Sequence, residues 1–380
     1  MCSIFAAFVL LWTIVPAPAY QLWLVAVVAS EWSLCFGALG LVGAAFGVAA
    51  LVAGSRRATV VLPLVLGVAA MMLGMVPPLQ AWKVARSNDV ELSLRRYLFG
   101  AGEARGKVKA QTITYATVDG QRLELDAYLP AGAGDGTTRR AAIIVVHGGS
   151  WNGGEKSDFP QWDRWLNEQG YAVFDVEYRL APQPNWRTAT GDIKCAVGWV
   201  KRNASQYGVD PERVALMGRS AGGHLALLAA YASNDERLPP SCDANDTSVR
   251  AVIAFYAPTD LRWAYDHPAN QRVIDGPATL RSLLGGDPQT ASEAFDIASP
   301  IAQVRAQTIP TLMFHGGRDQ LVREENMYRL AERLDGAHVP HKEIFIPYAQ
   351  HGFDYNFNGW GSQIAQPVML RFLQTYVAPK

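Results

Sequence analysis

The chain has 380 residues, of which 49% are hydrophobic, and its 34 basic and 34 acidic side chains give a formal net charge of zero. This balance argues against a protein that binds nucleic acid through a basic face, so no nucleic-acid partner is expected. The length accommodates one large α/β domain together with further segments.

Three stretches without charged residues begin the chain, and they cover residues 1–30, 32–55 and 58–82. Apolar stretches of this length are typical of helices that cross the hydrocarbon core of a bilayer. Pro16 and Pro18 interrupt the first stretch, which predicts a kinked or re-entrant segment, with a cleaved signal peptide as the alternative. We therefore predict a membrane anchor of two to three transmembrane helices over residues 1–82, followed by a linker over residues 83–110.

The charged residues near these stretches give conflicting indications of which side of the membrane the following domain occupies. Arg56 and Arg57 favour a cytoplasmic loop between the second and third stretches, whereas Lys83 favours a cytoplasmic position after the third. Because large domains translocate with less regard to flanking charge, we expect the domain that follows to lie outside the cytoplasm. Cys195 and Cys242 are candidates for a disulfide in such an oxidising compartment, and two isolated buried thiols are an equal alternative.

From residue 111 onward, short runs rich in β-branched residues alternate with amphipathic stretches. The runs predict eight strands, over residues 112–118, 122–129, 141–146, 171–178, 213–218, 251–256, 311–316 and 342–347. The stretches between them predict helices near residues 160–169, 188–206, 221–233, 320–334 and 362–377. Asp119-Gly120 signals a hairpin between the first two strands, while later strands are apolar on both faces. We predict an eight-stranded, mostly parallel sheet covered by helices over residues 111–380, with residues 258–308 as a candidate lid.

A serine among small residues lies where the fifth strand meets its helix. Gly218 and Gly222 flank Ser220 at a spacing typical of a strained strand-to-helix turn that exposes the serine hydroxyl. A serine hydroxyl is a weak nucleophile at neutral pH, so it needs a base within hydrogen-bonding reach and an acid that orients this base. The pattern predicts Ser220 as a nucleophile.

Residues suited to be the acid and the base follow the last two predicted strands. Asp319 comes after the seventh strand in the run GGRDQLV, and His351 comes after the eighth in the run HGF. Because the carboxyl ends of parallel strands meet at one edge, Ser220, Asp319 and His351 are expected to meet there in the order nucleophile, acid, base.

Other histidines and one other acid fit these roles less well. His224 lies one helical turn past the serine, where the helix carries it away from the hydroxyl. Asp354 is the competing acid, but it is too close to His351 in sequence to reach the far nitrogen of the imidazole easily. His338 and His341 have a metal-like spacing without a suitable third ligand, so no metal or other cofactor is expected.

A glycine-rich loop after the third strand is the candidate for stabilising negative charge. Glycines allow backbone N–H groups to approach a substrate oxygen without intervening side chains. We predict that the N–H groups of Gly148 and Gly149, with that of Ala221 after the nucleophile, form an oxyanion hole.

These motifs together resemble the α/β-hydrolase superfamily, and within it the carboxylesterases related to hormone-sensitive lipase and the BD-FAE-like feruloyl and acetyl-xylan esterases. The motifs that carry the resemblance are HGGSW (147–151), YRLAP (178–182), DPERVALMGRSAGGHLA (210–226), GGRDQLV (316–322) and HGF (351–353). The resemblance implies a serine esterase without metal or organic cofactor, in which Tyr178 and Arg179 are mainly structural. Ser150 stands where hormone-sensitive-lipase relatives commonly have a third glycine, and the resulting pattern is also similar to that of kynurenine formamidase.

The sequence therefore predicts a membrane-anchored serine carboxylesterase that acts on small to medium acyl esters of a small molecule, a lipid or a sugar. Cleavage of an amide, as in formamidases or peptidases, and acyl transfer to an alcohol are alternatives that use the same three residues. A non-enzymatic scaffold is disfavoured by the complete set of candidate catalytic residues.

Overall fold

A computed structural model describes residues 1–54, 58–100, 109–130 and 139–377. The predicted cytoplasmic loop with Arg56 and Arg57 lies outside the described residues.

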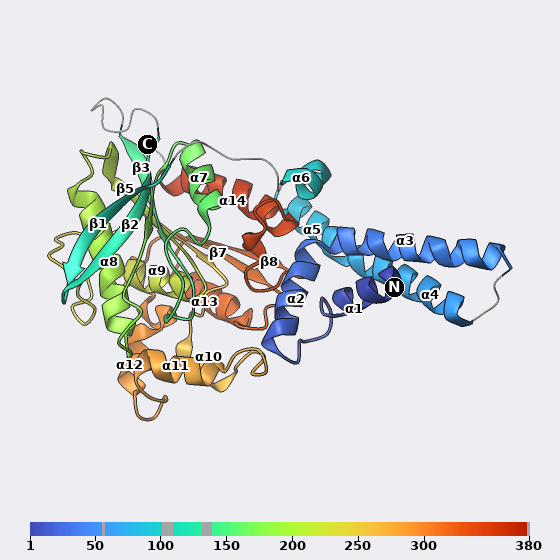
Figure 1. Ribbon diagram of the computed structural model, residues 1–380. Coiled ribbons are helices and arrows are strands. Elements are labelled where there is room, and N and C mark those ends of the chain that lie inside the picture. Colours follow the sequence, from blue (N-terminus) through green and yellow to red (C-terminus); the bar gives the residue numbers. More distant parts are fainter. Residues whose placement is uncertain (55–57, 101–108, 131–138, 378–380) are drawn as a thin grey trace.

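Eight strands form one sheet in the order β1-β2-β4-β3-β5-β6-β7-β8 (Figure 1). Their bounds are β1 Gln111–Val118, β2 Gln121–Tyr128, β3 Arg140–Val146, β4 Ala172–Val176, β5 Val209–Arg219, β6 Ala251–Phe255, β7 Thr311–Gly316 and β8 His341–Ile346. β2 pairs antiparallel with both β1 and β4, and the remaining pairs are parallel. The predicted mostly parallel sheet with an antiparallel edge is confirmed.

Helices cover both faces of the sheet and bury two separate cores. Alternation of side chains along β3 shows how one strand supplies both cores: Ile144 and Val146 face one, whereas Ile143 and Val145 face the other. The first core is covered by α8 (Trp186–Arg202), α9 (Ala221–Tyr231) and α13 (Glu325–Gly336). The second is covered by α7 (Pro160–Glu168) and α14 (Trp360–Tyr376). We call this part of the molecule the sheet domain.

The connection from β6 to β7 contains three short helices and a 3-10 turn. They are α10 (Leu261–Asp266), α11 (Gly276–Leu284), α12 (Ser292–Ala298) and η2 (Pro300–Gln303). In Figure 1 the three helices lie together at one end of the sheet domain. This is the segment predicted as a candidate lid.

The helices that precede β1 differ in position: α1, α3 and α4 project from the sheet domain, whereas α5 and α6 pack against it beside α14 (Figure 1). Their bounds are α1 Cys2–Leu11, α2 Tyr20–Glu31, α3 Ser33–Val52, α4 Ala58–Gly74, α5 Val76–Ser87 and α6 Leu94–Phe99. The first apolar stretch thus forms two short helices with Pro16 and Pro18 between them. Residues Ser33–Val52 and Val60–Ser87 are long and apolar enough to cross a membrane, which is weak evidence that they do so. Part of the stretch predicted as a linker is helical, since it contains the end of α5 and all of α6.

Small residues allow α3 and α4 to pack closely. A Cβ atom on Gly67 would lie 2.4 Å from the carbonyl oxygen of Gly40, so the two backbones could not approach this closely with larger residues. Ala6 and Leu10 of α1 are buried together with Ala70 of α4, which adds the first helix to this hairpin.

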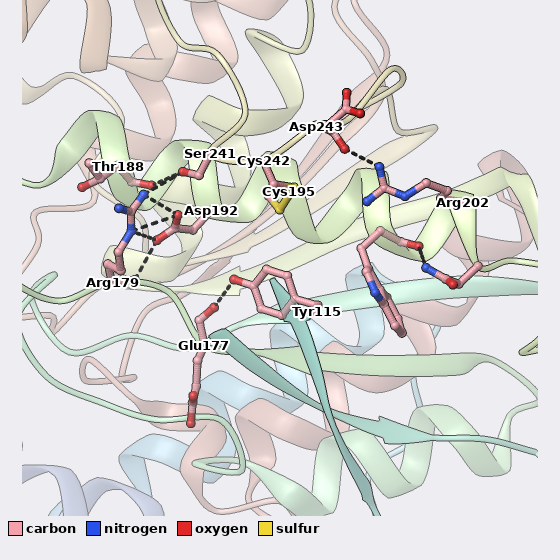
Figure 2. Close-up of a disulfide and its surroundings, with 12 residues drawn as sticks. Tyr115, Glu177, Arg179, Thr188, Asp192, Cys195, Arg202, Ser241, Cys242 and Asp243 are labelled. Atoms are coloured by element: carbon pink, nitrogen blue, oxygen red, sulfur yellow. Dashed lines mark hydrogen bonds and ion pairs between the residues drawn. A yellow bond between two sulfur atoms is a disulfide. The ribbon is translucent and has the colours of Figure 1, made fainter. Parts of the chain in front are cut away.

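A disulfide joins Cys195 of α8 to Cys242 in the segment before β6 (Figure 2). On the same helix, Asp192 forms a buried ion pair with Arg179 at 2.8 Å, and Arg179 also donates to Ser241 at 2.9 Å. Figure 2 shows these contacts side by side, so the segment around Cys242 is held to α8 by covalent and polar links.

Candidate active site

Ser220 occupies a sharp turn between β5 and α9. Its backbone has a φ of 53° and a ψ of −121°, a conformation that residues other than glycine rarely adopt. Close packing explains the small neighbours: a Cβ atom on Gly222 would lie 2.2 Å from the carbonyl oxygen of His147, and one on Gly218 would lie 2.2 Å from that of Gly222. The turn is therefore built as the sequence pattern predicts, with strain held by the surrounding backbone.

The structure brings Ser220, His351 and Asp319 into one hydrogen-bonded chain. The Nε2 atom of His351 lies 2.9 Å from Oγ of Ser220, and its Nδ1 atom lies 2.7 Å from Oδ2 of Asp319. The other oxygen of Asp319 accepts backbone N–H groups from Leu321 at 2.8 Å and Val322 at 2.9 Å. Such an arrangement fixes the carboxylate and orients the imidazole toward the serine.

Asp354, the competing acid, has a different partner. It forms a buried ion pair with Arg219, the residue before the nucleophile, and accepts a hydrogen bond of 2.6 Å from the hydroxyl of Tyr256. The Tyr256 ring centroid lies 4.4 Å from that of His351. Arg219, Tyr256 and Asp354 thus connect the end of β5 to the loop that carries His351.

Sequence reasoning did not identify Arg219 and Tyr256 as parts of this site. The available signal was that Arg219 directly follows the uncharged run 214–218, because a charged residue at a buried position needs a partner. Its partner could not be identified from sequence, since Asp354 lies in a distant loop.

The glycine-rich loop lies against the nucleophile. A Cβ atom on Gly148 would lie 3.1 Å from the carbonyl oxygen of Arg219 and 3.4 Å from Cβ of Ser220. Gly149 has a φ of 107°, which only glycine adopts readily. His147 stacks on Tyr178 with ring centroids 4.4 Å apart, and the Tyr178 hydroxyl donates to the carbonyl oxygen of His147 at 3.2 Å.

His224 of α9 holds the glycine-rich loop through a hydrogen bond to Trp151. Trp151 of the HGGSW motif donates its indole N–H to Nδ1 of His224 at 3.1 Å. The opposite nitrogen, Nε2, lies 2.8 Å from the carbonyl oxygen of Ala298 at the end of α12, and donates to it in this tautomer. Burial lowers the pKa of His224 to about 4, so the imidazole is neutral at neutral pH. His224 therefore ties the loop to the segment between β6 and β7.

A cavity of about 600 Å³, including its open mouth, lies beside Ser220. Ser150, Trp151 and Ala221 contribute to its wall, and most of the remaining wall is apolar. The apolar wall residues include Ala264, Pro268, Ile274, Leu280, Leu321 and Val322. Part of this wall comes from the candidate lid.

Within the residues that the structure describes, no three His, Cys, Asp or Glu side chains are grouped to hold a metal ion. His341 lies beside a backbone oxygen instead, with Nδ1 2.9 Å from the carbonyl of Val339. His315, also buried near the site, lies 3.5 Å from Asp319, and its pKa is lowered because burial disfavours the imidazolium form.

Comparison with protein families matches residues 125–334, more than half of the chain, to the BD-FAE family. The esterase LipQ of Mycobacterium tuberculosis is 33% identical over 222 residues, covering 57% of this chain and 51% of LipQ. The probable carboxylic ester hydrolase LipM of the same organism is 31% identical over 226 residues, covering 58% of this chain and 51% of LipM. The chain therefore matches these curated relatives over about half of their length.

Solved structures give a similar result. Esterase 2 of Thermogutta terrifontis, phosphorylated by paraoxon, has a TM-score of 0.59 and 26% identity, covering 72% of this chain and 96% of the esterase. The same esterase with butyrate bound has a TM-score of 0.57 and 27% identity, covering 72% and 96%.

Proposed function

The chain belongs to the BD-FAE family of α/β-hydrolases, and from this we propose that it is a serine carboxylesterase that cleaves esters with small to medium acyl groups. The observation that carries the proposal is the hydrogen-bonded chain from Ser220 through His351 to Asp319, with distances of 2.9 and 2.7 Å. Esterase names among the relatives and the solved neighbours support the same activity.

In the proposed reaction, Oγ of Ser220 attacks the ester carbonyl carbon while Nε2 of His351 accepts the hydroxyl proton. The carbonyl oxygen becomes negatively charged and accepts hydrogen bonds from the N–H groups of Gly148, Gly149 and Ala221. Collapse of this intermediate breaks the bond to the alcohol oxygen, which takes the proton from His351. Asp319 stabilises the imidazolium form throughout.

Water completes the cycle. His351 removes a proton from a water molecule, and the resulting hydroxide oxygen attacks the acyl carbon on Ser220. Collapse of this second intermediate breaks the bond to Oγ of Ser220, which takes the proton back from His351 as the acid is released. The cavity beside Ser220 offers an apolar wall for the acyl group.

The N-terminal helices are proposed to anchor the enzyme in a membrane, with the sheet domain outside the cytoplasm. The two long apolar helices support anchoring, and the Cys195–Cys242 disulfide supports an oxidising compartment. A reporter fused after residue 380 tests this topology, because it would be accessible from outside the cell only in the proposed orientation.

The decisive experiment measures ester hydrolysis and covalent labelling together. We expect Ser220→Ala to lower kcat by about 10⁶-fold and to abolish labelling by paraoxon, the reagent that phosphorylates the Thermogutta esterase. Ser150→Ala is the matched control, since Ser150 borders the same cavity and its loss should leave labelling intact. Labelling or hydrolysis that persists in Ser220→Ala would exclude the mechanism.

An amidase is the second candidate, because Ser150 gives the glycine-rich loop a pattern that is also similar to that of kynurenine formamidase. Ser150 also lines the cavity beside Ser220. Turnover of N-formylkynurenine without turnover of p-nitrophenyl butyrate would favour the amidase. The reverse result would favour the esterase.

A further inference from the structure

The segment between α1 and α2 reaches the loops that carry the candidate acid and base. The backbone N–H of Ala17 donates to the side-chain oxygen of Gln320 at 2.7 Å, and the amide of Asn270 donates to the carbonyl of Ala17 at 2.6 Å. Gln320 in turn donates to Gln350 at 3.2 Å. Gln320 follows Asp319, and Gln350 precedes His351, so an N-terminal segment is hydrogen-bonded directly beside the candidate catalytic residues.

An apolar contact extends this connection to the cavity. Trp23 of α2 is buried in one cluster with Ala17 and Val273, and Leu321 packs against the same cluster. Leu321 also lines the cavity beside Ser220. The cluster that holds Trp23 of α2 therefore reaches a residue of the cavity wall.

Residues 268–274 also contact both the cavity and the N-terminal segment. Ala269 and Ile274 line the cavity, whereas Asn270 and Val273 contact the N-terminal segment. The N-terminal segment thus lies against the outside of the cavity rim.

Helix α2 also leaves apolar side chains exposed. Tyr20, Leu24 and Val28 are 49%, 43% and 44% exposed, and their spacing of four residues places them on one face of the helix. Figure 1 shows α2 between the sheet domain and the α3–α4 hairpin, which extends away from it. If the hairpin crosses a bilayer, α2 lies at the end of the hairpin nearest the sheet domain, where the membrane surface would be (Figure 1).

Residues at the same end of the hairpin have a composition suited to that surface. Trp82 and Phe99 are 54% and 70% exposed, and the Arg86 guanidinium lies over the Trp82 ring, 5.4 Å from its centroid. Aromatic and basic side chains are enriched where a protein meets lipid headgroups. Trp82, Arg86 and Phe99 belong to helices at the end of the hairpin nearest the sheet domain, and the cavity rim contacts the segment between α1 and α2 at that same end.

We propose that the substrate is an ester held in the membrane, with a small to medium acyl group on an alcohol whose hydrocarbon chain remains in the bilayer. This inference rests on the proposed esterase function and names its substrate class. The ester group moves past the exposed face of α2 to Ser220, the acyl group occupies the apolar cavity, and the hydrocarbon chain of the alcohol stays against α2 and the lipid.

The test compares two butyrate esters that share the acyl group. Oleyl butyrate resides in phosphatidylcholine vesicles, whereas ethyl butyrate partitions largely into water, and butyrate release is measured for the full chain reconstituted in those vesicles. We expect kcat/KM for oleyl butyrate to exceed that for ethyl butyrate by at least tenfold. Leu24→Asp should lower the oleyl butyrate rate at least fivefold and leave the ethyl butyrate rate within twofold, because Leu24 does not line the cavity.

Tyr328→Asp is the matched control, since Tyr328 on α13 has the same 43% exposure as Leu24 and lies outside the N-terminal helices. It should leave both rates unchanged. The proposal is overturned if ethyl butyrate is the better substrate, or if Leu24→Asp leaves the oleyl butyrate rate unaffected. A parallel loss of both rates in Leu24→Asp and in the milder Leu24→Thr would also overturn it. If wild type cleaves neither ester, the proposed esterase function itself fails.

Discussion

Asp319 and Asp163 are both fully buried carboxylic acids of the sheet domain, but their surroundings are opposite. Asp319 accepts two backbone N–H groups and faces the imidazole of His351. Among the described residues, no donor reaches either oxygen of Asp163, and its side chain is instead within hydrogen-bonding reach of the carboxyl group of Asp175. Donors stabilise a charged carboxylate at the first position, whereas the second favours a shared proton.

The different surroundings of Asp319 and Asp163 suit them to different roles, one in the proposed reaction and the other in folding stability. A carboxylate with its donors already in place can stabilise an imidazolium without reorganisation. Within the part of the chain that the structure describes, Asp163 and Asp175 have a single donor between them, the backbone N–H of Ser157 at 2.6 Å from Asp175. Burial and mutual repulsion favour keeping at least one proton on the pair. We therefore expect changes at Asp319 to affect the rate of reaction, and changes at Asp163 to affect the pH dependence of folding.

The largest effect is expected for Asp319→Asn. The amide retains the shape of the carboxylate but cannot stabilise the charged imidazole in the same way, so kcat should fall by about 10⁴-fold with little change in KM. Ester hydrolysis by the variant and by wild type measures this directly. A loss below tenfold would mean that Asp319 does not orient the base.

A smaller effect, on stability, is expected for Asp354→Ala. Removal of this side chain leaves Arg219 buried with its charge unpaired, which should cost about 3–5 kcal/mol in free energy of unfolding. Urea denaturation followed by fluorescence measures the change. Tyr256→Phe is the control, since it removes only one hydrogen bond to Asp354 and should cost about 1–3 kcal/mol. Equal stability of Asp354→Ala and wild type would show that the ion pair is dispensable.

These acids also mark what the sequence could and could not predict. The order of Ser220, Asp319 and His351 along strand ends predicted which three residues meet, because parallel strands share one edge. The buried parallel strands could also be predicted, because each is a continuous apolar run. The catalytic roles remain predictions.

Contacts between distant segments could not be predicted in this way. Asp163 and Asp175 lie on a helix and a strand, and only the packing of α7 against β4 makes them neighbours. The hydrogen bond between Ala17 and Gln320 joins residues separated by 303 positions, and neither local pattern indicates the other as its partner. Such contacts depend on tertiary packing, which a local motif does not record.

The smallest effect, and the most specific test of the comparison, is the pH dependence of Asp163→Asn. Burial raises the pKa of Asp163 from 3.8 to about 7, and the pKa of Asp175 is also raised by burial and by the nearby Asp163. The folded protein therefore binds more protons than the unfolded chain between about pH 4 and pH 7. Stability from this group is fully present below pH 4 and is lost as pH rises through 7, by up to about 1.4 kcal/mol per pH unit for one proton.

Asp163→Asn supplies the hydrogen-bond donor that the shared proton supplies at low pH. The variant should match wild type near pH 4, exceed it in stability at pH 8, and show a shallower fall between these values in urea denaturation. Asp296→Asn, which changes an exposed carboxylate paired with Arg262, should retain the wild-type slope. If Asp163→Asn loses stability equally at every pH, then Asp163 is charged in the folded protein and resembles Asp319 after all.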